Sequence, residues 1–391
     1  MPLRPPAGFI SAFYDPLNNP NAPTIGAVTG GDATASVAFT APSNVGGSAI
    51  TGYGAISTPD GVTATAAASP ISVTGLTNGT AYTFAVWAIN SYGPSAFSAA
   101  SGSVTPAANP NRGVFGGGAG PLNVMDYITI TTTGNATDFG DLTQTVSRVA
   151  ACSSSTRGVF GGGTTGSNTN VMAYITIATA SNATDFGDLT SPTNILASCS
   201  SSTRGLFGGG INDAVGVTNT ITYITIASTG NSTSFGALTT SRYSLAACSS
   251  PTRGVFAGGA GSSAVIDYVT IASTGNAVSF GNLTFGNDSM AGCSSSTRGL
   301  FGGGGNAPSN TIQYITIAST GNATDFGDLT VGREQAGACS SETRGVFGGG
   351  TSPTNVIDYV TIATTGNATD FGDLTVARSG LAGCSSSHGG L

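Results

Sequence analysis

Six cysteines are the residues whose chemistry has to be settled first, because each occupies the same place in a repeated segment. They are Cys152, Cys199, Cys248, Cys293, Cys339 and Cys384. A disulfide needs Cα atoms within about 7 Å, which equivalent points of separate repeats do not offer. A zinc site needs four converging ligands, and the sequence contains no Cys-x-x-Cys pair. We therefore expect small, buried, free thiols on an inner strand, which suits assembly in a reducing compartment.

Histidine and carboxylate chemistry is weakly represented. The single histidine, His388, follows a serine run that recurs in every repeat without a placed acid, so we expect a turn there and not a catalytic pair. The paired Asp138 and Asp141 could bind Ca²⁺, but other repeats carry Ser234 or Ala237 at these places, which favours turn capping. We predict no catalytic residue, no cofactor and no metal. A polysaccharide lyase or hydrolase needs paired carboxylates or a site centred on histidine, and the sequence offers only scattered carboxylates. A copper radical oxidase needs two histidines, and the sequence contains one.

The repeated segment organises most of the chain. One copy reads Cys152-Ser-Ser-Ser-Thr-Arg157-Gly-Val-Phe160-Gly-Gly-Gly163. Its Arg-Gly pairs begin at residues 112, 157, 204, 253, 298 and 344, so the spacings are 45, 47, 49, 45 and 46 residues. The glycines end an apolar run and no lysine follows, so they predict close backbone approach and not a phosphate loop. We expect the repeated arginines to bind neighbouring carboxylates or carbonyls. A fixed period of this size indicates stacked or radial supersecondary units.

Each unit contains four candidate strands, in one copy 149–153, 157–162, 171–177 and 185–189, which we name a to d. The series opens with strand b at Arg112 and ends with strand a at Cys384, so the last strand can complete the first sheet and remove free edges. The Gly-Gly after an apolar run, the Tyr on the next strand and the late Phe resemble a kelch-type β-propeller. This resemblance implies a closed six-bladed β-propeller over residues 112–391; an open solenoid is the alternative.

Composition excludes several classes of protein. The 391 residues include 60 glycines, only 7% are charged, and the net charge is −7 with a pI near 4.4. A nucleic-acid binder or a polybasic membrane anchor would need clustered cations. The sequence contains no run of 18 apolar residues, so we expect no transmembrane helix. The first residues lack the apolar core and the cleavage site of a secretory signal, so we expect no signal peptide. Short β-branched and aromatic runs between Gly and Asn turns predict an all-β protein.

The N-terminal part is predicted to contain an arm, a sandwich and a linker. Residues 1–20 form a docking arm whose apolar patch is Phe9, Ile10, Phe13 and Tyr14; a disordered leader is the alternative. Residues 21–106 alternate like a β-sandwich, and the stretch from Leu76 through Tyr82 to Ser95 resembles the second half of a fibronectin type III domain. This resemblance implies a tyrosine corner made by Tyr82 and Leu76. Residues 107–111 are the predicted linker.

Variation between repeats is confined to two of the four connections. The a–b and c–d connections are nearly invariant, whereas the b–c and d–a connections differ and emerge on one face of an antiparallel unit. Loops on a rigid scaffold commonly carry recognition, although drift in surface loops is the alternative. The predicted binding residues on this variable face are Gln144, Arg148, Asn194, Asn212, Asp213, Arg242, Tyr243, Phe285, Asn287, Asp288, Arg333, Glu334, Gln335 and Arg378. We expect alanine at Arg242, Tyr243, Arg333 and Glu334 together to leave folding intact and to abolish binding.

The whole arrangement resembles bacteriophage virion structural proteins, especially those of phages that infect cyanobacteria and other aquatic bacteria. The residues that carry the resemblance are Gly8–Tyr14, the sandwich that follows Asn21, and the near-identical unit 344–375. The resemblance implies a tail fibre component or a capsid decoration on the virion surface, made in the host cytoplasm. Its arm and sandwich would bind other virion proteins, and its variable face would bind host glycan or protein; the chain would be multimeric in the particle. A purely structural virion protein and a secreted, extracellular bacterial adhesin are the alternatives.

Overall fold

The protein is described by a computed structural model that covers residues 18–31, 33–106, 111–120, 122–305 and 309–391. This described part is all-β, with 49% strand and no helix, as the composition predicts. The chain separates into two compact units, Met1–Asn109 and Pro110–Leu391, which we describe in turn. The predicted docking arm up to residue 17, with Phe9, Ile10, Phe13 and Tyr14, lies outside the described residues, as do residues 107–110 of the predicted linker.

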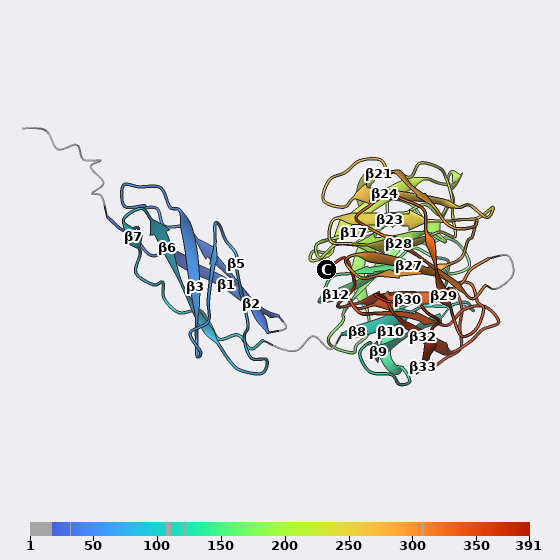
Figure 1. Ribbon diagram of the computed structural model, residues 1–391, viewed down its shortest axis with the longest axis horizontal. Helices are drawn as coiled ribbons and strands as arrows, with labels where there is room; N and C mark the ends of the chain where they lie inside the picture. Colours follow the sequence, from blue (N-terminus) through green and yellow to red (C-terminus); the bar gives the residue numbers. More distant parts are fainter. Residues whose placement is uncertain (1–17, 32, 107–110, 121, 306–308) are drawn as a thin grey trace, which may run out of the picture. The chain divides into compact units, whose positions relative to one another are not determined.

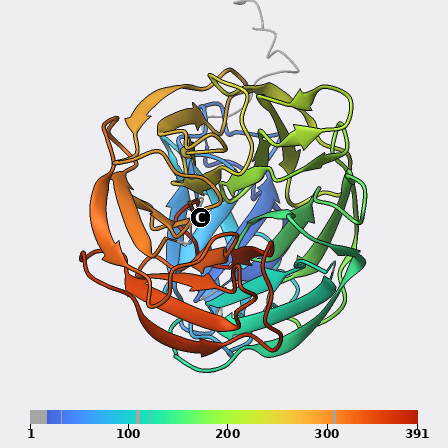
Figure 2. The same ribbon diagram turned by 90° about the vertical axis from the view of Figure 1, so that its right-hand side faces the viewer.

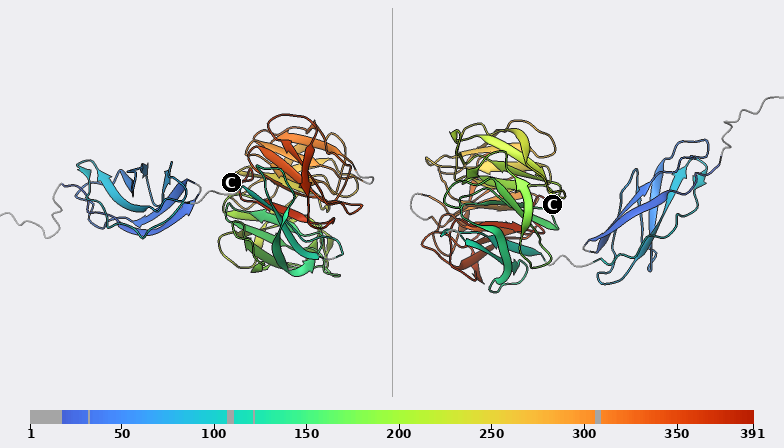
Figure 3. Two further views of the ribbon diagram at one scale, coloured as in Figure 1. Left: turned by 90° about the horizontal axis from the view of Figure 1, so that it is seen from below. Right: turned by 180° about the vertical axis from the view of Figure 1, so that it is seen from behind.

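The N-terminal unit consists of two antiparallel sheets (Figures 1 and 3). One contains β1 (Thr24–Gly31), β2 (Thr34–Thr40) and β5 (Ile71–Thr74) in the order β1-β2-β5. The other contains β3 (Gly52–Thr58), β4 (Thr63–Ala66), β6 (Thr83–Asn90) and β7 (Gly93–Pro94) in the order β4-β3-β6-β7. Both sheets contribute to one buried cluster, because strands such as β6 alternate buried and half-buried residues.

Tyr82 locks this unit at the start of β6. Its side chain is fully buried in the same cluster as the buried Leu76. The phenol oxygen accepts a hydrogen bond from the Thr77 amide at 3.0 Å and donates to the Asp60 carboxylate at 2.6 Å. The hydroxyl of this buried ring therefore has the polar partners that its burial requires. Trp87 points away from the core and covers Gly54, where a Cβ would collide with its indole ring.

Six four-stranded antiparallel sheets make up the C-terminal unit, and they follow one another around a common centre (Figure 2). We number them 1 to 6 along the chain. Their innermost strands, in this order, are β34 (Ala382–Ser385), β11 (Ala150–Ser153), β16 (Ala197–Ser200), β22 (Ala246–Ser249), β26 (Ala291–Ser294) and β30 (Gly337–Ser340). The second strands are β8 (Arg112–Gly116), β12 (Arg157–Gly161), β17 (Arg204–Gly208), β23 (Arg253–Ala257), β27 (Arg298–Gly302) and β31 (Arg344–Gly348).

The outer half of each sheet repeats equally regularly. The third strands are β9 (Leu122–Thr129), β13 (Val171–Thr176), β20 (Thr220–Thr225), β24 (Val265–Thr270), β28 (Thr311–Thr316) and β32 (Val356–Thr361). The outermost strands are β10 (Thr137–Val146), β14 (Thr184–Asp188), β21 (Thr233–Ala237), β25 (Val278–Asn282), β29 (Thr324–Asp328) and β33 (Thr369–Asp373). A small extra sheet of β15 (Thr193–Asn194), β18 (Ile211–Asn212) and β19 (Gly216–Val217) joins a d–a connection to a b–c connection. These two kinds of connection therefore meet on one side, as predicted.

The last strand closes the series. β34 pairs antiparallel with β8, with Cys384 opposite Val114, so the first sheet takes its inner strand from the end of the chain, as the strand count predicts. Each innermost strand also lies beside the innermost strands of its two neighbours, and β34 lies beside both β30 and β11. The inner strands thus form a closed circle, and each of the six sheets has a neighbouring sheet on both sides.

The hydrophobic core lies between neighbouring sheets in six equivalent clusters. Each cysteine of an inner strand packs against the glycine of the next sheet's Arg-Gly pair; a Cβ on Gly254 would lie 2.6 Å from the Cys199 sulfur. This contact explains why a glycine follows every repeated arginine. The cysteines are buried and free, as predicted, and burial raises the pKa of Cys199 to about 12.

Polar side chains join the sheets at their periphery. The guanidinium carbon of Arg157 stacks 4.2 Å from the centre of the Tyr174 ring, and the group donates to the Ile226 carbonyl of the next sheet at 3.0 Å. The other repeated arginines do the same, so the predicted carbonyl partners are confirmed. Asn182 in a c–d connection accepts a hydrogen bond from the Asp141 amide of the preceding sheet at 3.0 Å. The Asn-Ala-Thr turns therefore cap the neighbouring sheet.

Candidate functional site

A ring of six backbone positions surrounds the centre of the C-terminal unit where the inner strands begin. These positions lie four residues before each cysteine: Arg148, Ile195, Ser244, Ser289, Gln335 and Gly380, which we call the rim. All six adopt positive φ, from 53° at Ile195 and Ser289 to 65° at Gly380. This conformation is uncommon for residues with a Cβ, so six equivalent occurrences mark a shared structural requirement.

The shared backbone conformation allows each rim residue to form a hydrogen bond with the next rim residue. The amide of Arg148 donates to the Gly380 carbonyl at 2.6 Å, and that of Ile195 to the Arg148 carbonyl at 3.3 Å. The remaining links run from Ser244 to Ile195, Ser289 to Ser244, Gln335 to Ser289 and Gly380 to Gln335, at 2.8 to 3.1 Å. The left-handed turn directs each amide around the circle, and the rim is closed without help from any side chain.

The rim is the mouth of a cavity of about 440 Å³. Below it lies a layer of larger apolar side chains, including Val149, Leu196, Leu245 and Met290, and then a layer of small residues that includes Ala151, Ser198 and Gly292. The rim itself and the neighbouring Tyr243 bring a guanidinium, an amide, hydroxyls and an aromatic ring to the mouth. The size falls within the range of small-molecule sites, and the combination of apolar wall and few polar groups is typical of them.

Past the small-residue layer lies a second cavity of about 50 Å³, and this opposite end is ringed uniformly by serine. In the serine ring, Ser153, Ser200, Ser249, Ser294, Ser340 and Ser385, each hydroxyl donates to the carbonyl of the serine in the preceding sheet at 2.7 or 2.8 Å. Each hydroxyl also accepts an amide hydrogen bond at 3.1 to 3.4 Å. Each hydroxyl is thus bonded to backbone groups of the neighbouring serines, and the Ser200 hydroxyl also lies 3.4 Å from His388 Nε2, so the serine ring joins the inner strands at this end.

Residues 386–391, the tail segment, lie across this end, and the end of the chain is seen near the centre of the sheets in Figure 2. His388 Nε2 lies 2.9 Å from the Ser153 carbonyl and therefore donates to it, while Nδ1 accepts from the Gly390 amide at 3.0 Å. The Gly389 amide donates to the Ser294 carbonyl at 3.0 Å. Both imidazole nitrogens are occupied by backbone, and burial lowers the pKa of His388. The prediction of a structural histidine fits these contacts.

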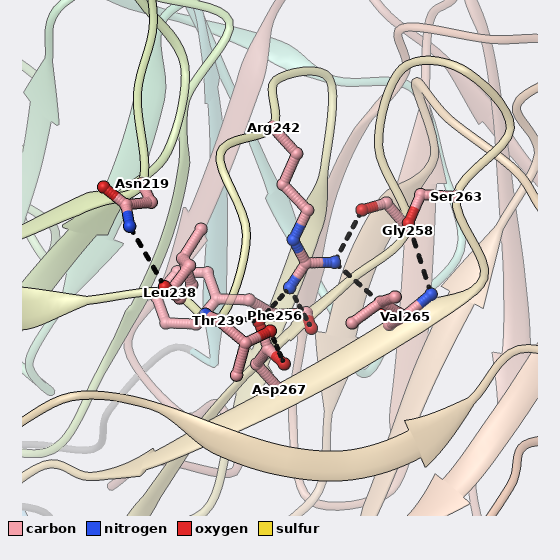
Figure 4. A network of polar contacts seen from close by, with 9 residues as sticks. All are labelled: Asn219, Leu238, Thr239, Arg242, Phe256, Gly258, Ser263, Val265 and Asp267. Atoms are coloured by element: carbon pink, nitrogen blue, oxygen red, sulfur yellow. Dashed lines mark hydrogen bonds and ion pairs between the residues drawn. The ribbon is translucent and has the colours of Figure 1, made fainter.

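Three of the predicted binding arginines are buried, and the prediction that they lie on an exposed face is wrong. Arg242 is 3% exposed and pairs with Asp267, with 2.6 Å between Nη2 and Oδ2 (Figure 4). Its other nitrogen donates to the Gly258 and Val265 carbonyls at 2.7 Å. Equivalent pairs are Arg333 with Asp358 and Arg378 with Asp126. Desolvation lowers the pKa of Arg242, and the adjacent carboxylate opposes that shift.

Asn287 is buried as well, with its amide donating to the Gly303 carbonyl at 3.0 Å, so it does not lie on the exposed face either. Alanine at Arg242 and at Arg333 would each leave a fully buried carboxylate without its counter-charge, so we now expect the four-residue alanine variant to lose stability. The sequence shows that a residue lies in a loop, but it does not show which way the side chain points. At the position six residues before each cysteine, the side chain points inward.

The inward positions are matched across the sheets. The residue six before the cysteine faces a residue of strand c: Arg242 with Asp267, Arg333 with Asp358 and Arg378 with Asp126. At the equivalent places of sheet 2, Val146 and Ala173 line one cavity of about 10 Å³, and in sheet 3 Thr193 and Thr222 line one of about 60 Å³. Charged residues thus meet charged ones, and neutral residues meet neutral ones. This pattern was the sequence signal that could have revealed the burial.

The other predicted binding residues are distributed unevenly. Arg148, Tyr243 and Gln335 line the cavity mouth together, whereas Ile195, Ser244, Ser289 and Gly380 were missed although they share the same spacing from cysteine. A further group lies in loops away from the cavity lining: Gln144, Asn194, Asn212, Asp213, Phe285, Asp288 and Glu334. Of these, Phe285 is exposed, and Asp213 accepts a hydrogen bond from Asn168. Burial and the nearby Asp288 raise the pKa of Glu334.

No protein-family model matches the chain, and no curated protein matches it. Within the described residues, no group of three or more His, Cys, Asp or Glu side chains is placed to hold a metal ion. The same residues include no helix with the length and apolar character needed to cross a membrane.

Proposed function

We propose that the chain is a non-enzymatic bacteriophage virion surface protein, a tail fibre component or capsid decoration, that recognises the host surface through the rim of the central cavity. In this proposal residues 112–391 form a kelch-like six-bladed β-propeller and residues 21–106 a fibronectin type III-like sandwich. The pairing of β34 with β8 supports the first assignment, and the Tyr82 hydroxyl bonded to the Thr77 amide supports the second. The arm and the sandwich attach the chain to other virion proteins.

The observation that carries the recognition role is the difference between the two ends of the cavity. The serine end has one residue type throughout, its hydroxyls bond the backbone of the neighbouring serines, and the tail segment lies across it. The rim end is open, and its six equivalent positions carry five residue types. A fold that needed only closure would serve equally well with one residue type at both ends. Diversity on a fixed backbone is what recognition of a specific ligand requires.

Blocking the mouth tests this proposal. Ser244→Trp places a large ring at the rim, and Ser228→Trp is the matched control, because Ser228 is exposed on a c–d connection. Full-length protein is compared with both variants for binding to intact cells of candidate aquatic bacterial hosts by flow cytometry. We expect Ser244→Trp to abolish binding and Ser228→Trp to retain it. Equal binding by both variants contradicts recognition through the rim, and attachment to virions without any cell binding would favour the purely structural role.

A further inference from the structure

Arg148 is the one arginine among the described residues whose guanidinium makes no contact within the fold. The sequence contains 11 basic residues, all of them arginine. Six stack on tyrosine rings and bond carbonyls of the next sheet, and three form buried ion pairs. Among the described residues, Arg148 alone has a guanidinium without a ring, carbonyl or carboxylate partner. It is also exposed, whereas every other described arginine is buried or half-buried.

The backbone holds Arg148 at the cavity mouth. Its φ of 57° is fixed by the rim hydrogen bonds, which its amide enters by donating to Gly380. Gly380 is the rim position without a side chain, and the neighbouring side chains converge above it. A Cβ built there would lie 3.5 Å from Arg148 Cγ and 3.8 Å from Gln335 Oε1. The guanidinium stem and an amide group therefore flank the same gap in the rim.

Charge makes this gap distinctive. Arg148 is the only charged residue that lines the cavity, while the chain carries a net charge of −7. Asp288 and Glu334 directly precede the rim residues of sheets 5 and 6, and their mutual repulsion contributes to the raised pKa of Glu334. Neither carboxylate lines the cavity, so the charge that an anionic group meets in the lining is that of Arg148, which attracts it. Arginine binds a carboxylate through two parallel hydrogen bonds, which orients the ligand as well as attracting it.

The remaining groups favour a sugar over a peptide. A peptide bound as an added strand needs free main-chain donors, but all six rim amides are already donated to rim carbonyls. The groups left for a ligand are side chains: the hydroxyls of Ser244, Ser289 and Tyr243 and the amide of Gln335. These groups suit ring hydroxyls, and the apolar layer with Leu245 and Met290 suits the C–H face of a pyranose.

We propose that the cavity binds a carboxylate-bearing sugar residue, with the carboxylate on Arg148 and the sugar ring in the mouth. This inference rests on the proposed recognition of the host surface and names the class of ligand. Hexuronic acids and sialic acids share the required chemistry, and the test below distinguishes them. The sugar carboxylate supplies a partner to the Arg148 guanidinium, which has none among the described residues.

Calorimetric titration of the full-length protein tests the proposal with oligogalacturonate, with its fully methyl-esterified form and with sialyllactose. We expect one of the acidic ligands to bind at least about tenfold more tightly than the neutral ester, because a charge-assisted hydrogen bond is lost with the ester. Arg148→Gln should remove this preference and Arg148→Lys should retain part of it. Ser228→Asp makes the same one-unit change in net charge away from the rim and should leave the preference intact.

Equal binding of acidic and neutral sugars, no binding of either acidic ligand, or an unchanged preference in Arg148→Gln would overturn the proposal. A competing acidic peptide that displaces every ligand from the rim would assign the cavity to a protein partner instead. The two proposals fail separately: if Ser244→Trp abolishes cell binding while no acidic sugar is preferred, recognition through the rim stands and the ligand class is wrong.

Discussion

The buried pair Arg242–Asp267 can be exchanged for a pair that the same chain already uses in another sheet. Three variants are compared: Arg242→Val, Asp267→Ala and the double variant, which reproduces Val146 and Ala173 of sheet 2. Either single change leaves one ionised group, less than 4% exposed, without its counter-charge. The double change removes both charges together and leaves a combination whose counterpart packs around a cavity of only about 10 Å³.

The expected energies follow from this geometry. Breaking a buried ion pair by removing one partner costs about 3–5 kcal/mol, whereas replacing both partners by apolar residues is often neutral. Arg242 keeps its bonds to the Gly258 and Val265 carbonyls when Asp267 is removed, and Asp267 keeps its bonds from Thr239 when Arg242 is removed. We therefore expect about 3 kcal/mol for each single variant and less than about 2 kcal/mol for the double, against roughly 6 kcal/mol if the two changes were independent.

Denaturant unfolding measures these differences, with circular dichroism following the whole chain. The only tryptophan, Trp87, lies in β6 of the N-terminal unit, so its fluorescence reports on that unit alone and should not shift in any of the three variants. A double variant that loses as much stability as the sum of the two singles would refute the reasoning, since the two buried residues would then act independently. A loss below about 1 kcal/mol in Asp267→Ala would refute it too, by showing that the charge is solvated in the folded state.

Three further predictions concern the interior of the C-terminal unit. Gly205→Ala places a Cβ against the Cys152 sulfur, so we expect a loss of roughly 1–3 kcal/mol in chemical unfolding; the additional change Cys152→Ala should restore part of it, and no restoration would refute the steric cause. Because burial raises the pKa of Cys199 to about 12 and holds the other thiols protonated, the folded chain should react with an aromatic disulfide reagent at pH 8 far more slowly than the denatured chain, which absorbance measures directly. Burial lowers the pKa of His388 below 6.5, so the unfolded chain binds this proton more readily than the folded chain. Stability should therefore fall as the pH drops below about 6.5. His388→Gln should make the melting temperature less dependent on pH between 7 and 5, and identical curves for the two proteins would contradict the assignment.

Periodicity in the sequence predicted much of the architecture, and side-chain direction limited the prediction of the site. The strand positions and the pairing of the last strand with Arg112–Gly116 follow from patterns that act within a unit or between neighbouring units. The Tyr82 hydrogen bond was implied by the resemblance to fibronectin type III domains. The burial of Arg242 was not predicted, because one loop carries inward-facing and outward-facing residues only two positions apart. Arg242 is buried whereas Ser244 reaches the rim. The cavity could not be predicted, because its mouth is formed by six positions far apart in the sequence. They share a positive φ, but their residue types do not indicate it.

Pairing of β34 with β8 has a consequence for the timing of synthesis. About 270 residues separate Arg112 from Ala382, so β8 leaves the ribosome long before its partner exists. At a synthesis rate of 5–20 residues per second, the interval is roughly 14 to 54 s. During that interval β8 presents a free strand edge, while the strands that follow it can pair as soon as they emerge. An inner strand of a second nascent chain carries nearly the same sequence as β34, so polysomes bring together competitors for this edge, and the yield of closed monomer depends on how quickly each chain is completed.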